Sequence, residues 1–257
     1  MKRLPPVLVA AAVAAYIFLY LPLVIVVAYS FNDSKLNAEW VGFTFNWYNV
    51  LLHDETMLTA ARNSFVIAVV AAFFSTILGT MAGFALYRFK LRLLPVLVLA
   101  PVAIPEILMG VSLLMFFVLL NFTLGLSSII LSHITFCISF VAVVVRSRLA
   151  GMDESLTEAA RDLGATPVRA FRLVTLPLIM PGIIAGALMA FTLSIDDFVI
   201  TFFTAGVGAT TLPLQIYSMI KIAVTPEVNA VSTLLMLVTL LLIVVATKIA
   251  PSALRSE

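Results

Sequence analysis

Three acidic residues, Glu106, Asp196 and Asp197, interrupt long apolar stretches of the sequence. A carboxylate inside a membrane-spanning helix is costly unless it faces a wet cavity or the interior of a helix bundle, so such residues are candidates for function. All three carry the charge that attracts a cation, and carboxylates can replace part of the water around an ammonium group. The sequence therefore predicts that they line a pathway for a positively charged substrate.

Each of these carboxylates also has a structural interpretation. Glu106 follows Pro105, so it could lie in the first turn of a helix that restarts after Pro101, where a carboxylate complements the helix dipole. Asp196 and Asp197 could be solvated at the outer edge of the membrane. Adjacent helical residues project about 100° apart, so both aspartates cannot face one narrow pathway. One of them is expected to orient its surroundings.

The segment 146–176 differs from the rest of the chain, because it holds nine of the 28 charged residues. Ser155 or Thr157 could cap a helix there, and Gly164 would end it. A second short helix is expected from about 167 to 173. The pattern predicts a helix, a turn and a helix that lie across one face of the membrane.

Other kinds of chemistry find little support. No lysine lies in a glycine-rich phosphate-binding loop, so this chain is not expected to hydrolyse ATP, to bind a cofactor or to be an enzyme. His53 and His133 are far apart, and Cys137 is the only cysteine, so no metal site is predicted. We interpret His133 as a polar residue that packs between helices, together with Ser132 and Thr135, and Cys137 as a small buried residue.

The composition indicates an integral membrane protein. Hydrophobic residues make up 63% of the 257 residues and charged residues only 11%, against about a quarter in soluble domains. The first apolar run continues to about residue 30, which favours a retained helix over a cleaved signal peptide. We expect a single all-α integral membrane domain, residues 1–257, with six spans at about 7–30, 64–87, 94–119, 126–145, 177–200 and 230–250.

The basic residues are distributed unequally between the two sides of the membrane in this predicted topology. Twelve of the 15 lysines and arginines lie on the side of the termini, and three lie on the other side. The positive-inside rule therefore predicts that both termini are cytoplasmic. The twelve are Lys2, Arg3, Arg88, Lys90, Arg92, Arg146, Arg148, Arg161, Arg169, Arg172, Lys248 and Arg255, and the three are Lys35, Arg62 and Lys221.

Two outer loops, about 31–63 and 201–229, are long enough to hold structure of their own. Trp40 and Trp47 in the first loop suit an interfacial aromatic belt, or else a docking surface for an external partner. In the second loop, the apolar stretch 214–222 favours a short interfacial or re-entrant helix.

A spaced motif in segment 146–176 resembles a known family. Glu158-Ala159-Ala160 is followed after three residues by Gly164, and after nine more by the run that ends at Pro177. This pattern is similar to the EAA loop of type I ATP-binding cassette (ABC) importer permeases. The resemblance implies that Glu158, Ala159, Ala160 and Gly164 contact an ATP-binding subunit. Small alanine and glycine faces permit close approach, and charges such as Arg161 can fix its orientation.

The same resemblance implies partners and a location. These are a second permease subunit, a dimer of ATP-binding subunits that uses ATP and magnesium, an extracytoplasmic substrate-binding protein, and the lipid of the bacterial inner membrane. Nucleic acid is not among the expected partners.

Nearly the whole chain resembles permeases of spermidine/putrescine importers, the PotC-type subunits, which implies a polyamine cargo. Glu106 departs from that pattern, which has Asp at this place. The similar segments include residues 29–32, 47–48, 132–137, 162–165, 191–197, 212–213, 216–219 and 226–230.

Alternative functions remain open from the residues. The chain could belong to an importer of another solute such as thiamine, iron or an anion, although acidic residues in the spans argue against an anion. An ion-coupled secondary transporter or channel would use the same carboxylates for protons or sodium. An enzyme within the membrane is the weakest alternative, because no nucleophile with a base is evident.

Overall fold

The computed structural model describes residues 5–34, 39–89 and 91–249 of the chain. The regular secondary structure of these residues is helical, and a single isolated antiparallel bridge joins Asn32 to Phe43. Several predicted topology markers, Lys2, Arg3, Lys35, Lys90 and Arg255, lie outside the described residues, as does the side chain of Lys248.

Contacts divide the chain into two compact units, which are described separately. The N-terminal unit consists of Met1–Leu58 and Gln215–Val238, and the core unit consists of Thr59–Leu214 and Thr239–Glu257. In the N-terminal unit, α1 (Pro6–Tyr29), α2 (Asn46–His53) and the first part of α12 (Pro226–Ile249) are the main elements. The short helix α11 (Leu212–Ile222) begins in one unit and ends in the other, and it confirms the helix expected in the second outer loop.

An aromatic cluster organises the loop after α1. The ring of Phe31 lies 5.1 Å from that of Phe43 and 5.3 Å from that of Phe45, and the Trp47 indole donates a hydrogen bond to the Asn32 carbonyl oxygen at 2.8 Å. Trp47 is therefore tied to the loop of its own unit. Trp40 is half exposed at 50% and is available at the surface.

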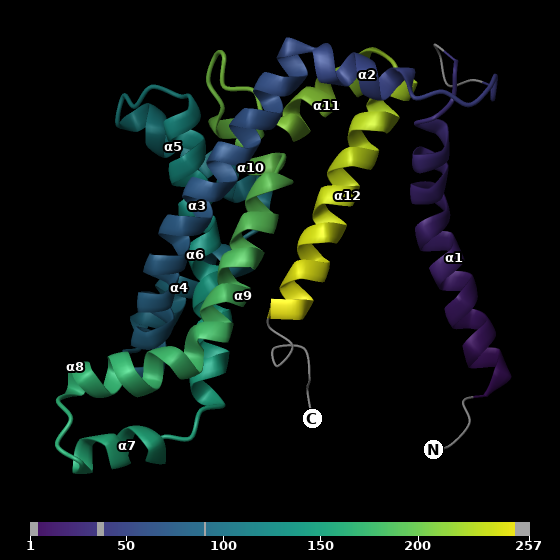
Figure 1. The fold of residues 1–257 in the computed structure, drawn as a ribbon. Coiled ribbons are helices and arrows are strands. Elements are labelled where there is room, and N and C mark those ends of the chain that lie inside the picture. The colour runs from purple at the N-terminus through teal and green to yellow at the C-terminus, as the bar shows by residue number, and fades with distance from the viewer. Residues whose placement is uncertain (1–4, 35–38, 90, 250–257) are drawn as a thin grey trace. The chain divides into compact units, whose positions relative to one another are not determined.

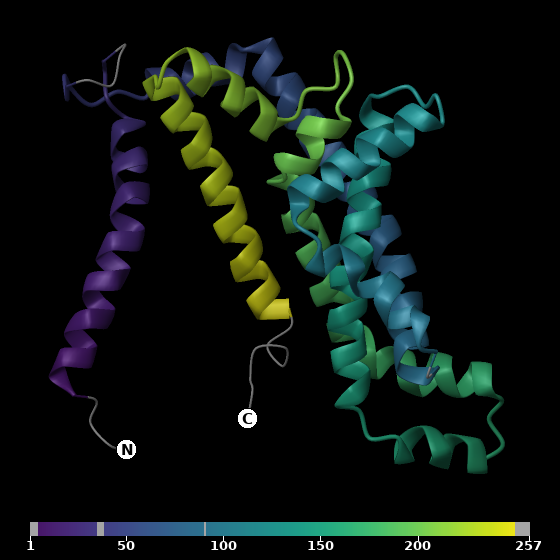
Figure 2. The ribbon, with the colours of Figure 1, turned by 180° about the vertical axis from the view of Figure 1, so that it is seen from behind.

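In the core unit, helices α3 to α10 are connected in chain order, and α7 and α8 lie at one end while α5 and α10 lie toward the other (Figures 1 and 2). The bounds are α3 (Glu55–Arg88), α4 (Leu93–Ala103), α5 (Glu106–Leu119), α6 (Leu126–Ala150), α7 (Ser155–Asp162), α8 (Pro167–Ala170), η1 (Phe171–Thr175), α9 (Leu176–Ile195) and α10 (Val199–Thr204).

Helix α6 runs through the centre of this unit. Three residues of α6 are fully buried, namely Cys137, Val141 and Val145. The burial of Cys137 confirms the prediction that it is a small buried residue. A Cβ atom added at Gly79 of α3 would lie 2.6 Å from the Val141 Cβ atom, and one added at Gly186 of α9 would lie 3.1 Å from the Val141 Cγ1 atom. These glycines allow α3 and α9 to approach α6 closely, as small residues do in membrane helix bundles.

The predicted span 94–119 is broken into α4 and α5 with a bend of 110°, and Glu106 lies in the first turn of the restarted helix, as its structural interpretation expected. The break lies at Ile104 and Pro105. Ile104 is extended (φ −81°, ψ 133°), as expected for a residue before proline, whose ring disfavours a helical neighbour. Pro101 lies inside α4, so the helix restarts after Pro105 and not directly after Pro101.

The fifth span also differs from its prediction. The helix expected from 167 begins at Pro167 as predicted, but the chain stays helical through the π-helical turn η1 to Ile195, so there is no end near 173 and no separate start at 177. Residues 196–198 are not in a regular helix, and α10 follows them. The predicted span therefore ends five residues later than the helix.

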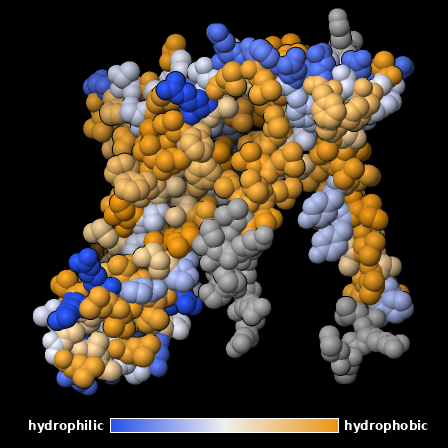
Figure 3. Space-filling view, in the orientation of Figure 1, coloured by the Kyte–Doolittle hydropathy of each residue, from blue (hydrophilic) through white to orange (hydrophobic). Residues whose placement is uncertain are grey.

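The other predicted spans correspond to helices. α1, α6 and α12 cover the predicted ranges closely, whereas α3 begins nine residues before the predicted 64. Four described helical runs are long and apolar enough to cross a membrane, or five if α4 and α5 count as one span. The described apolar part of α12, Pro226–Leu242, is too short to count among them. Apolar side chains cover much of the surface, and hydrophilic ones gather near α7 and α8 and along the top of the view (Figure 3). The all-α membrane fold is confirmed, while the count of six and the cytoplasmic termini stay predictions.

Candidate functional site

The helix α7 carries the predicted partner-contact residues at one end of the core unit. Its first backbone N–H, that of Ser155, donates to the Asp153 carboxylate at 3.0 Å. The N-cap residue is Glu154, whose side chain makes no capping bond, and Asp153 satisfies the Ser155 N–H in its place; the expectation that Ser155 or Thr157 caps the helix is wrong. Hydrogen bonds from the Ser155 hydroxyl and the Ser155 N–H hold the pKa of the exposed Asp153 carboxyl below its usual value.

Gly164 ends α7, as predicted. Its φ of +87° lies in the left-handed region, and its N–H donates to the Arg161 carbonyl oxygen at 2.9 Å. The next N–H, that of Ala165, reaches back to the Ala160 carbonyl oxygen at 3.1 Å. This pair of bonds is the Schellman arrangement, which favours glycine because glycine adopts positive φ without steric cost.

Gly164→Ala is expected to destabilise this turn by about 1 kcal/mol, because an L-residue pays that much in the left-handed region. A Cβ atom at this position meets nothing within 4 Å, so the cost is conformational and not steric. Limited proteolysis of segment 151–166 should speed up about fivefold, since cleavage follows the open population. Gly151→Ala, at φ −92°, is the matched control and should leave the rate unchanged. An unchanged proteolysis rate for Gly164→Ala would contradict the stabilising role of glycine at this turn.

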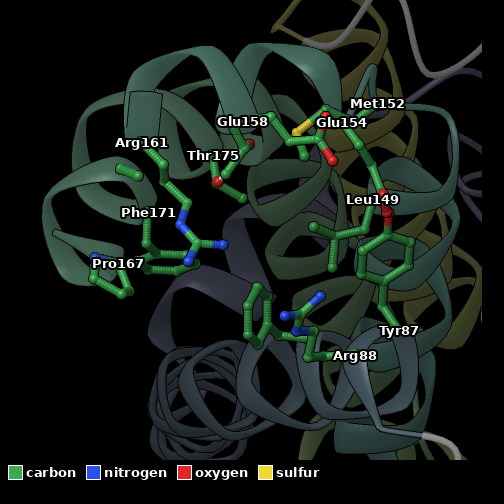
Figure 4. Close-up of a pocket in the computed structure, with 13 residues that line it drawn as sticks. Tyr87, Arg88, Leu149, Met152, Glu154, Glu158, Arg161, Pro167, Phe171 and Thr175 are labelled. Carbon is green, nitrogen blue, oxygen red and sulfur yellow. Dashed lines mark hydrogen bonds between the residues drawn. The ribbon is translucent and has the colours of Figure 1, made fainter. Parts of the chain in front are cut away.

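A pocket of about 290 Å³ lies between α7, the turn η1 and the C-terminal ends of α3 and α6 (Figure 4). The Tyr87 hydroxyl donates to the Glu154 carboxylate at its rim, and the Phe84 and Phe171 rings pack edge to face at 5.3 Å. These contacts join α3 to both sides of the loop. The lining also includes Arg88, Leu149, Met152, Thr157, Glu158, Arg161, Pro167, Ala170 and Thr175.

The charged residues of α7 remain available to a partner. Glu158 and Ala159 are exposed and Ala160 is half-buried. Within the part of the chain that the structure describes, no ion pair joins Glu158, Arg161 or Asp162 to another side chain. The predicted contact of Glu158, Ala159, Ala160 and Gly164 with an ATP-binding subunit stays a prediction, and their exposure is compatible with it.

The three predicted pathway carboxylates lie in one region of the core unit. Glu106 is the first residue of α5, and Asp196 and Asp197 occupy the break between α9 and α10. Asp196 is exposed, and its carboxylate lies within electrostatic range of those of Glu106 and Asp197. The fold thus brings Glu106 and Asp196 together from distant parts of the sequence.

Asp197 turns inward, whereas Asp196 does not. The Asp197 side chain is 6% exposed and lies 3.3 Å from the His133 Nε2 atom. Its Oδ1 atom accepts hydrogen bonds from the Thr201 N–H at 2.9 Å and from the Thr201 hydroxyl at 3.1 Å. The two aspartate side chains therefore point in different directions because the helix is broken at these residues. The difference does not come from the rotation of about 100° between neighbours in a regular helix.

The interpretation of His133 as a packing residue is confirmed, since it joins α6 to the ends of α9 and α10. Ser132 is also buried, although its hydroxyl, like that of Thr135, donates to a carbonyl oxygen of its own helix; Thr135 is exposed, so the expected packing role is wrong for Thr135 only. Ser194 and Thr201, the other partners of His133, were not predicted from the sequence. The spacing of Asp197 and Thr201 by four residues, with a threonine that can donate, is the one signal that could have indicated Thr201.

A protein-family model described as "Binding-protein-dependent transport system inner membrane component" matches residues 75–254. This range contains all the predicted site residues. The match is therefore independent of the residues before 75.

Two curated relatives match over most of the chain. The spermidine/putrescine transport system permease protein PotC of Escherichia coli K12 is 43% identical over 240 residues, which cover 92% of this chain and 91% of that protein. The putrescine transport system permease protein PotI of the same strain is 46% identical over 231 residues, covering 86% and 82%.

Among solved structures, a chain of the inward-facing MetNI methionine ABC transporter is 25% identical, with a TM-score of 0.65. The match covers 79% of this chain and 100% of that one. The family model, the relatives and the fold agree, and the chain belongs to the family of inner membrane components of binding-protein-dependent transport systems.

Proposed function

We propose that this chain is a permease subunit of an ATP-driven importer for polyamines such as spermidine and putrescine. The single observation that carries the cargo is the grouping of Glu106, Asp196 and Asp197 in one region of the fold. Ammonium groups are recognised by carboxylates that replace their water, and acidic residues are costly in a membrane protein unless they serve such a purpose. The names of the two relatives support the same cargo.

The exposed helix α7 is the proposed contact with the ATP-binding subunit. Glu158, Ala159 and Ala160 lie on it, and Gly164 fixes where it ends. The contacts of Tyr87 with Glu154 and of Phe84 with Phe171 join this loop to α3, so a force applied to α7 is passed to a membrane helix. Hydrolysis then belongs to the partner, which uses ATP and magnesium, and this chain needs no cofactor.

The assembly that we propose contains a second permease subunit, two ATP-binding subunits and an extracytoplasmic binding protein, all at the bacterial inner membrane. Closure of the ATP-binding subunits draws the two α7 loops together and shifts the equilibrium toward an outward-open state, in which the binding protein releases its cargo. Glu106 and Asp196 then take over ammonium groups of the cargo. Binding must stay weak enough for the cargo to leave on the other side.

Uptake of labelled putrescine and spermidine into proteoliposomes that contain all four kinds of subunit is expected to require enclosed ATP, and to persist when ionophores collapse the proton and sodium gradients. An assembly without the ATP-binding subunits is the matched control and should show no uptake. ATP-dependent uptake of another solute without amine uptake would contradict the cargo. Gradient-driven uptake by this chain alone would contradict the importer and favour a secondary transporter.

A further inference from the structure

His133 lies at the meeting point of three helices of the core unit. It is 2% exposed, and both of its ring nitrogens have partners. The Nδ1 atom is 2.7 Å from the Ser194 hydroxyl at the end of α9, and the Nε2 atom is 3.0 Å from the Thr201 hydroxyl of α10. One imidazole thus connects α6 to the elements on both sides of a broken helix.

The donors and acceptors of this network are mutually consistent. The Thr201 hydroxyl donates its hydrogen to Asp197, so its oxygen is free to accept from the His133 Nε2–H. The same Nε2–H points toward Asp197 at 3.3 Å. A buried carboxylate is tolerated only when donors surround it, and these groups supply them. The network therefore holds Asp197 in its inward position.

The network spans the break in which Asp196 lies. Ser194 precedes the break and Thr201 follows it, while residues 196–198 are outside both helices. A break without regular helical hydrogen bonds has many accessible geometries, and contacts to a third helix select one of them. His133 is that third-helix contact, and the direction of Asp196 depends on the geometry that it selects.

The position of Glu106 depends on the same network through α10. A Cβ atom added at Gly110 of α5 would lie 2.6 Å from a ring carbon of Phe203 on α10, so the two helices touch at van der Waals distance. Glu106 lies about one helical turn before Gly110. A shift of α10 therefore moves α5, and with it the Glu106 carboxylate.

We infer that His133 is a positioning residue that sets the distance between the Glu106 and Asp196 carboxylates, and thereby the spacing of ammonium groups that the pathway prefers. The inference rests on the proposed function, because it assigns a role in selecting among amines. His133 touches no cargo in this account. It acts through Asp197 and Thr201, which fix the break.

The experiment compares uptake of 1,4-diaminobutane and 1,5-diaminopentane by the complete assembly, with one binding protein used throughout so that its own preference cancels between variants. His133→Leu removes the centre of the network, and Thr201→Val removes the two bonds of the Thr201 hydroxyl, to His133 and to Asp197, with little change in volume. Ser132→Ala is the matched control, because Ser132 is a buried neighbour whose hydroxyl bonds only within α6. The ratio of Vmax/KM for the two diamines is the quantity compared.

The ratio of Vmax/KM for the two diamines is expected to change about tenfold in His133→Leu, because one methylene group provides a discrimination of that size. In Thr201→Val the ratio should change in the same direction by a smaller factor. Ser132→Ala should keep the wild-type ratio. A role in packing alone lowers uptake of both diamines by one common factor, and that result would overturn the inference while the proposed function stands. If His133→Leu does not assemble, Thr201→Val decides by the same criterion. Absence of any amine uptake by the wild type would overturn the proposed function, and the inference with it.

Discussion

Glu158→Ala is expected to lower ATP-driven amine uptake at least about tenfold while the subunits still assemble. Glu158 is exposed on α7 and no described side chain forms an ion pair with it, so its charge is available to the ATP-binding subunit. Truncating one partner of a buried, hydrogen-bonded charge pair across an interface costs about 2–5 kcal/mol, and about 1.4 kcal/mol already corresponds to tenfold. Uptake and ATP hydrolysis measured on the same proteoliposomes test this.

The matched control is Glu55→Ala, at an exposed glutamate in the first turn of α3. It removes the same side chain at a site outside the α7 loop, and uptake should remain at the wild-type level. The comparison separates loss of coupling from a general loss of acidic charge. Wild-type uptake in Glu158→Ala, or an equal loss in Glu55→Ala, would refute the role of α7 in coupling.

The elements that the sequence predicts well are those that a local pattern decides. A bilayer demands long apolar helices, so apolar windows locate α1, α6 and α12 closely. The end of α7 at Gly164 follows from the one residue type that adopts positive φ at no cost. The restart of the helix at Glu106 follows the proline rule and agrees with the predicted first turn, although the helix breaks at Pro105 and continues through Pro101.

The break between α9 and α10 could not be predicted from its own residues. The run from Ser194 to Phe198 contains no glycine or proline, and apolar residues flank its two aspartates. What stabilises the break is His133, which lies 61 residues before Ser194 in the sequence. A contact over that distance is a property of the folded bundle, so no local pattern records it. The π-helical turn η1 is missed for the related reason that its residues also suit an ordinary helix.

The two breaks have a common consequence for the pathway. A helix that spans a membrane without interruption satisfies its own backbone groups and presents side chains only sideways, whereas a broken helix can turn a terminal residue toward a cavity. Glu106 begins α5 after one break, and Asp196 lies in the other. The acidic residues of the chain that lie deepest in apolar sequence are therefore placed where the helices are interrupted, which is the arrangement expected of a substrate site.

Glu106→Gln and Asp196→Asn are each expected to lower Vmax/KM for spermidine about 10- to 100-fold without loss of assembly. Hydrogen bonds to charged groups contribute about 1.5–3 kcal/mol, and each substitution removes one carboxylate while it keeps the shape of the side chain. Because the two carboxylates repel each other when no cation is present, the effects of the pair should not add, and the double variant measures their coupling.

Asp33→Asn is the matched control for this pair, since Asp33 is an exposed carboxylate of the loop after α1 and is outside the cluster. It removes one negative charge and should leave Vmax/KM unchanged. Asp197→Asn has a different expected outcome, because Asp197 accepts two bonds from Thr201 and faces His133. Its loss should change the preference between diamines as His133→Leu does, whereas loss of Glu106 or Asp196 should weaken uptake of both. Wild-type kinetics in Glu106→Gln and Asp196→Asn would remove the carboxylates from the pathway.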